Sequence, residues 1–169
     1  MKTLQALLAH FACAFLPLHA APTATDLGII GDGTSDLTLD TIGSSVRDTE
    51  LGVYDAAGNR IGNNDDFTGG NLKSRLILGL AEGTYYAAVS AYDTNFGPAD
   101  FAVTGGGKSG EIVLNYSDGD VAGSATGSLD LADGVGGVTW FSFEIGVVHG
   151  SESHSPGSIL FKRTDGLNV

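Results

Sequence analysis

Apolar and polar residues alternate along several short stretches of the chain. Leu37 and Leu39 are each followed by a polar residue, and every second residue from Leu76 to Leu80 is a leucine. A period of two is that of a β-strand, because successive side chains point to opposite faces. In residues 84–92, TYYAAVSAY, both alternating sets are largely apolar. That pattern indicates a strand inside a sandwich of two sheets.

Other short apolar runs lie between segments rich in glycine and asparagine, and the chain has 26 glycines. Turn residues at such short intervals are typical of an all-β chain. We expect further strands at 100–104, 111–116, 128–131, 140–145 and 158–162. Together these strands predict an all-β fold, a jelly-roll-like antiparallel β-sandwich.

Residues 48–66 read DTELGVYDAAGNRIGNNDD and predict a β-hairpin. Its strands are expected at 51–55 and 60–63, because Gly58 or Asn59 can adopt the positive φ of a tight turn. Acidic residues precede the first strand and follow the second. Since antiparallel strands run back beside one another, the two acidic ends should meet at one edge of the sheet.

A shared cation is one interpretation of these acidic ends. Calcium prefers six to eight oxygen ligands from carboxylates, amides and carbonyls. The residues able to supply side-chain oxygens there are Asp48, Glu50, Asn64, Asp65 and Asp66. The alternative interpretation is a solvated acidic edge that discourages pairing with strands of other molecules. The sequence leaves both open.

Two other uses of the carboxylates are weaker. Asp118 and Asp120 in a glycine-rich turn form a second candidate cation site, to which Asp130 and Asp133 could contribute. A glycosidase would need two carboxyl groups at a defined separation across a cleft. Neighbouring aspartates on one turn do not provide that arrangement, so we expect no enzymatic activity.

The first twenty residues, MKTLQALLAHFACAFLPLHA, have the pattern of a secretory signal peptide. Lys2 is followed by an apolar stretch too short for a spanning helix, and cleavage is expected after Ala20. The single cysteine, Cys13, lies within this segment, so the exported chain would form no disulfide. We therefore expect a secreted protein with no membrane insertion after cleavage, and residues 21–169 suit one domain.

The chain carries a formal net charge of −12. Removal of residues 1–20, whose only lysine, arginine, aspartate or glutamate is Lys2, changes this charge to −13. Nucleic acids and anionic membranes would repel so acidic a protein. The charge thus excludes nucleic acid as a partner and is compatible with cation binding.

Several motifs, taken in order, resemble the bacterial pre-peptidase C-terminal-like domain family. They are DTELGVYD at 48–55, GN at 58–59, NDD at 64–66, LKSRL at 72–76 and EGTYY at 82–86. The similarity covers residues 26–104, with Val53 where leucine is usual and Glu82 where alanine is common. It implies a secreted, non-catalytic jelly-roll-like sandwich, normally attached to exported enzymes, and some relatives bind calcium.

The resemblance suggests a domain at 21–117. Residues 123–146, with Trp140 and Phe143, resemble the opening strands of the same family. Residues 118–169 therefore either complete the first sandwich or form a truncated second repeat. Completion is favoured because an orphan half-repeat would leave its aromatic side chains without a core.

The function expected from these features is that of a secreted accessory or interaction module, stabilised by calcium, that contacts an extracellular protein or polysaccharide. A carbohydrate-binding module is the alternative. Its stacking platform would come from the aromatic residues Tyr85, Tyr86, Tyr92, Phe96 and Trp140. Because Tyr85, Tyr86 and Tyr92 occupy strand positions, packing in the core is the stronger interpretation for these rings.

Overall fold

The computed structural model describes residues 20–131 and 137–146. Its strands are β1 (Thr25–Gly31), β2 (Leu37–Asp40), β3 (Thr49–Asp55), β4 (Arg60–Asn64), β5 (Arg75–Leu78), β6 (Gly83–Ala91), β7 (Asn95–Phe96), β8 (Val103–Thr104), β9 (Gly110–Ser117), β10 (Ala122–Leu129) and β11 (Thr139–Ile145). They confirm the predicted all-β sandwich. Within these residues, no helix has the length and apolarity needed to cross a bilayer.

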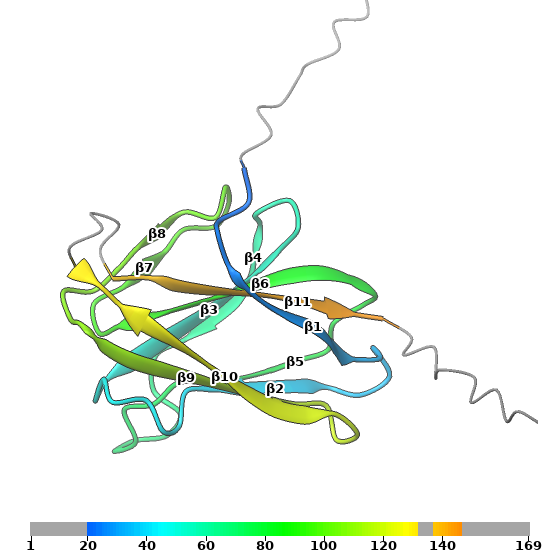
Figure 1. Cartoon of the computed structure of the whole chain (residues 1–169), viewed down its shortest axis with the longest axis horizontal. Coiled ribbons are helices and arrows are strands. Elements are labelled where there is room, and N and C mark those ends of the chain that lie inside the picture. Colours follow the sequence, from blue (N-terminus) through cyan, green and yellow to red (C-terminus); the bar gives the residue numbers. More distant parts are fainter. Residues whose placement is uncertain (1–19, 132–136, 147–169) are drawn as a thin grey trace, which may run out of the picture.

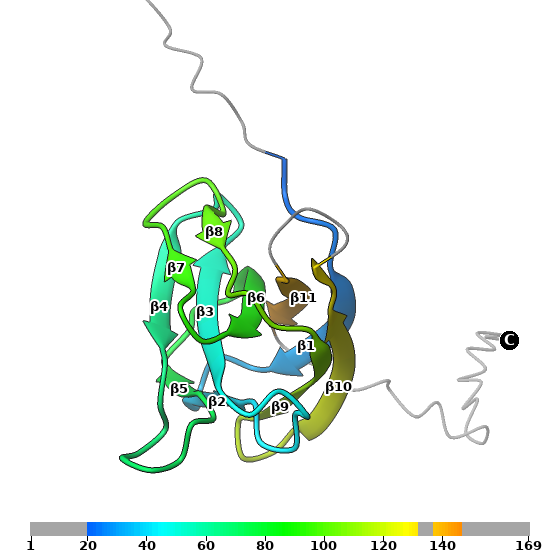
Figure 2. The same cartoon turned by 90° about the vertical axis from the view of Figure 1, so that its left-hand side faces the viewer.

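Two sheets pack face to face (Figures 1 and 2). One has five strands in the order β1-β11-β6-β3-β4, and the other has four in the order β10-β9-β2-β5. Paired neighbours among the described strands are antiparallel except β1 and β11, which run parallel. Strands β10 and β11 thus lie in the same two sheets as β2 and β6 and share their core.

The core between the sheets follows the predicted alternation. Leu37 and Leu39 of β2 are fully or almost fully buried, and so is every second residue of β6 from Ala87 to Ala91. Phe141 and Phe143 of β11 lie in the same core. Burial of these side chains is the main favourable contribution to folding.

A second, smaller apolar cluster covers the outer face of the five-stranded sheet. Tyr54 and Ala88 are buried there together with Phe96, which belongs to β7 in the segment that covers this face. The prediction that both faces of residues 84–92 are covered is therefore confirmed for β6, in which residues 87–91 are all buried. Figure 2 shows β7 and β8 lying beside β3.

Two strand predictions differ from the structure. Only Val103–Thr104 of the segment 100–104 is a strand, because Asp100 and Phe101 have positive φ values of 61° and 53°. Strand β10 starts at Ala122, six residues before the predicted 128–131. Its small residues hide the alternation. A Cβ at Gly123 would lie 2.4 Å from the Tyr116 hydroxyl, so a larger residue there would have to displace that ring.

Strand β1 was not predicted from the sequence, and its pairing explains why. Its register with β11 shifts twice, and Gly28 has a positive φ of 69°, so side chains do not alternate regularly. The predicted strand at 158–162 lies outside the described residues, as do residues 1–19 of the expected signal peptide.

Candidate functional site

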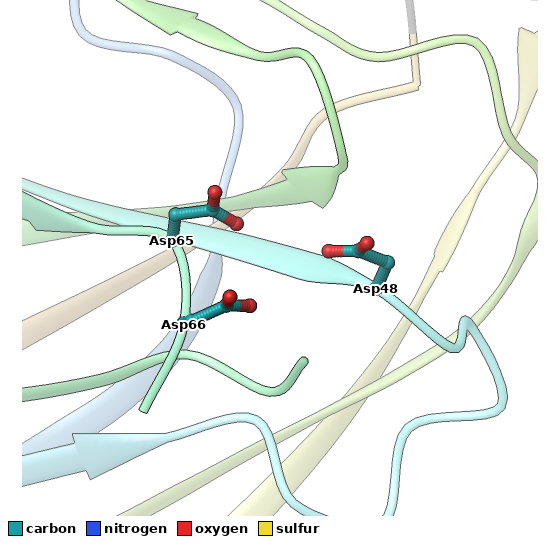
Figure 3. Close-up of side chains that lie close together, drawn as sticks. All are labelled: Asp48, Asp65 and Asp66. Carbon is teal, nitrogen blue, oxygen red and sulfur yellow. The ribbon is translucent and has the colours of Figure 1, made fainter. Parts of the chain in front are cut away.

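The hairpin formed by β3 and β4 brings its acidic ends together, as the sequence predicts. Leu51 pairs with Asn64 at the end of the ladder, so Asp48 before β3 lies near Asp65 and Asp66 after β4. One carboxylate oxygen from each of the three aspartates lies within 4.8 Å of the others. Figure 3 shows the three carboxylates pointing toward a common space. We call these three residues the acidic cluster.

Hydrogen bonds hold the two chain segments that carry the acidic cluster. The Ser74 hydroxyl donates to the carbonyls of Thr49 and Asp65 and so ties the start of β3 to the end of β4. The Phe67 N–H donates to the Lys73 carbonyl at 2.7 Å, which closes the loop after Asp66. These contacts fix the chain segments that carry the carboxylates relative to one another.

Two oxygens at this end of the hairpin are buried and find no hydrogen-bond partner among the residues that the structure describes. They are Asp48 Oδ1 and Asn64 Oδ1. A buried acceptor without a donor costs roughly 1–3 kcal/mol, so native structures seldom leave one unexplained. Carboxylate and amide oxygens are the ligands that a hard cation such as calcium prefers. The donor set present here fits such an ion.

The electrostatics of the acidic cluster also favour a bound cation. Burial raises the pKa of Asp65 above its ordinary value, and the neighbouring Asp66 and Asp48 raise it further. Like charges this close repel one another unless a cation lies between them. Without a cation, repulsion within the ionised acidic cluster lowers the stability of the folded state.

Lys73 is the nearby cation that sequence reasoning missed. Its ammonium donates hydrogen bonds to the carbonyls of Ser44, at 2.9 Å, and Val46. Burial lowers its pKa, while the charge of Asp48 raises it. Lys73 thus compensates part of the negative charge. Nothing in the local sequence distinguishes it from an exposed loop lysine.

Glu50 was predicted as a fourth carboxylate ligand, but the structure does not bring it into the group of three. Its side chain is 7% exposed and accepts hydrogen bonds from the backbone N–H groups of Asp93, at 2.8 Å, and Thr94, at 3.2 Å. Burial raises its pKa, although these two bonds lower it. The loop after β6 supplies donors for Glu50 that the hairpin sequence alone cannot reveal.

The second candidate cation site is not assembled among the described residues. Asp118 and Asp130 lie beyond opposite ends of β10, a strand of eight residues that spans roughly 26 Å. Asp118 accepts hydrogen bonds from the N–H groups of Asp120 and Val121, at 3.0 and 2.7 Å, and so closes its own turn. Asp133 lies outside the described residues.

Most of the aromatic residues considered for a stacking platform are packed. Tyr85 and Phe96 are buried, and Tyr86 and Trp140 are partly buried around Phe101, whose ring centroid lies 5.1 and 6.0 Å from theirs. Core packing is therefore correct for these four. Tyr92, one residue beyond β6, is the exception, with 59% of its surface exposed.

The chain matches no family model, no curated protein and no solved structure. The resemblance to pre-peptidase C-terminal-like domains therefore stays a prediction.

Proposed function

We propose that this protein is a secreted, non-catalytic β-sandwich that acts as an accessory or interaction module and is stabilised by calcium. The observation that carries the proposal is the acidic cluster, in which oxygens of Asp48, Asp65 and Asp66 lie within 4.8 Å of one another. The buried and unpartnered Asp48 Oδ1 adds a second reason. Bound calcium would satisfy that oxygen and offset the mutual repulsion of the three carboxylates.

The effect of the ion would be structural. Asp48 directly precedes β3, and Asp65 and Asp66 directly follow β4. One ion bound to all three would therefore join the chain segment before β3 to the segment after β4. An ion held only by the native state, at a hundred times its Kd, adds about 2.7 kcal/mol to the free energy of unfolding.

Secretion and the accessory role rest on the sequence. Residues 1–20 have the pattern of a signal peptide, and the expected mature chain has no cysteine, so the stability of an exported fold would come from its core, from bound ions or from both. The acidic residues gather at the end of one hairpin, where a structural ion is a better use for them than paired acid–base catalysis.

Thermal unfolding of the purified protein in EDTA and across a calcium titration tests the proposal. We expect calcium to raise Tm well above the effect of equal magnesium, because magnesium needs a tighter octahedral site and releases its water reluctantly. Asp65→Ala with Asp66→Ala should remove the calcium effect. Asp120→Ala with Glu111→Ala changes the net charge equally at two exposed positions and should leave it intact.

Superimposed unfolding curves in calcium and EDTA would refute the calcium site. Sequencing of the N-terminus of protein recovered from the culture medium of an expressing host tests secretion separately, with Ala21 expected as the first residue.

A further inference from the structure

Within the described residues, the cationic side chains that make neither a hydrogen bond nor an ion pair converge on one place. Of the five lysines and arginines in these residues, Arg60 donates to the Phe96 carbonyl, Lys73 to two carbonyls and Arg75 to Asp40. Arg47 and Lys108 are exposed, and within the described residues their side chains make no hydrogen bond or ion pair. In a chain with a net charge of −12, two such side chains at one site stand out.

Both residues line a groove of about 470 Å³. Tyr92, the exposed ring noted above, lines it as well, and Val46 and Leu72 supply apolar surface. This volume lies within the usual range for small-molecule sites, which is about 300–1,000 Å³. The groove therefore combines two cations, an exposed aromatic ring and a small apolar floor.

The groove adjoins the acidic cluster because both include Asp48. The Asp48 carbonyl accepts a hydrogen bond from the Tyr92 N–H at 3.2 Å, which fixes the start of the Tyr92 segment against the start of β3. An anion in the groove would meet the charge of Asp48 well within the screening length of about 8 Å at physiological salt. A cation on the acidic cluster would remove that repulsion.

We infer that the groove lined by Arg47, Lys108 and Tyr92 binds an anionic saccharide of the uronic-acid type, and that calcium on the acidic cluster strengthens this binding. The guanidinium of Arg47 can pair with a sugar carboxylate through two parallel hydrogen bonds, and the ammonium of Lys108 can hold a second. Tyr92 offers an aromatic face for the apolar C–H face of a pyranose ring. The calcium dependence, but not the saccharide site, rests on the proposed function.

A saccharide suits this groove better than an acidic peptide. Extended peptides commonly bind by adding a strand to an exposed sheet edge, where backbone hydrogen bonds provide the affinity. The residues used here lie in loops, at 45–48, 92 and 108–109, and offer no strand edge. Binding therefore depends on side chains, which recognise a carboxylate and a ring face.

Isothermal titration calorimetry with trigalacturonate tests the inference, using the purified protein in excess calcium and in EDTA. We expect binding in calcium, weaker binding in EDTA, and a loss of about tenfold in affinity for the methyl ester of the same sugar, which lacks the charges. Arg47→Gln and Lys108→Gln should each weaken binding by a similar factor. Arg60→Gln makes the same change in charge at the opposite end of the hairpin and should have no effect.

Tyr92→Ala should also weaken binding of trigalacturonate, whereas Ile77→Ala, which removes a side chain that is 62% exposed on β5, should not. The saccharide site is refuted if trigalacturonate does not bind, if its methyl ester binds equally well, or if hexaglutamate binds more tightly. Equal affinity in calcium and EDTA would refute the linkage between the sites. If calcium raises Tm while trigalacturonate fails to bind, only the groove inference falls; the reverse result refutes the calcium proposal alone.

Discussion

Both ends of the hairpin formed by β3 and β4 carry aspartates, but the two ends differ in the hydrogen-bond donors that they provide for the carboxylates. At the turn, the Asp55 carboxylate accepts hydrogen bonds from the N–H groups of Ala57, at 2.9 Å, and Asn59, at 2.8 Å. The Asn59 side chain donates a third at 2.9 Å. At the other end, no group in residues 20–131 and 137–146 donates to the buried Asp48 Oδ1, and two more aspartates face it.

The pKa values of Asp55 and Asp65 are shifted in opposite directions by this difference in hydrogen-bond donors. Burial alone would raise the pKa of Asp55, but the hydrogen bonds from Asn59, Ala57 and Gly58 outweigh it and hold the pKa below its ordinary value. Burial and two neighbouring carboxylates raise the pKa of Asp65. The local supply of N–H donors thus separates an aspartate that stabilises a turn from aspartates that require an external cation.

The largest effect in this comparison is expected from Asp55→Ala. The change removes three hydrogen bonds to a carboxylate, and we expect it to lower the free energy of unfolding by about 2 kcal/mol. The loss should be equal in calcium and in EDTA, because the turn satisfies Asp55 without a cation. Urea denaturation in both buffers measures it. A loss confined to calcium would break the distinction between the two ends.

A smaller effect, but one that changes sign, is expected from Asp65→Asn combined with Asp66→Asn. In EDTA these changes should raise the free energy of unfolding by about 0.5–1 kcal/mol, because they remove repulsion between like charges. In excess calcium the same variant should be less stable than the wild type. Urea denaturation of both proteins in each buffer gives the comparison.

The matched control for this sign change is Glu111→Gln with Asp120→Asn, which alters the net charge equally away from the acidic cluster. Its effect should have the same sign in both buffers. If the cluster variant also shows one sign throughout, the acidic end is a solvated edge and not a cation site.

The smallest effect is expected in the pH dependence of the turn. Because the native pKa of Asp55 lies below the ordinary value of 3.8, the native state binds fewer protons than the unfolded state near that pH. The stability that the carboxylate contributes is present above pH 3.8 and is lost as the pH falls through the lower native pKa. The difference in unfolding free energy between wild type and Asp55→Asn should therefore shrink at acid pH. A constant difference would contradict the hydrogen-bonded turn.

Much of the fold was predictable because its signals are local. Alternation identified β2, β5 and β6, and short apolar runs between turn residues identified most of β9 and β11. Gly58 adopts a positive φ of 83° in the predicted turn. Strands without large apolar residues or with an irregular register, such as β10 and β1, carry no such signal. Their places depend on partners that are distant in the sequence.

The sequence by itself determined the hairpin and the proximity of Asp48 to Asp65 and Asp66. Two antiparallel strands joined by a short turn necessarily bring the start of the first strand beside the end of the second. Only the tertiary structure decided that Glu50 turns to the loop after β6 and that Tyr92 remains exposed. It also decided that Arg47 and Lys108 meet at one groove. These contacts join segments separated by some forty to sixty residues, and side-chain patterns within a strand hold no information about loops that approach from another part of the chain.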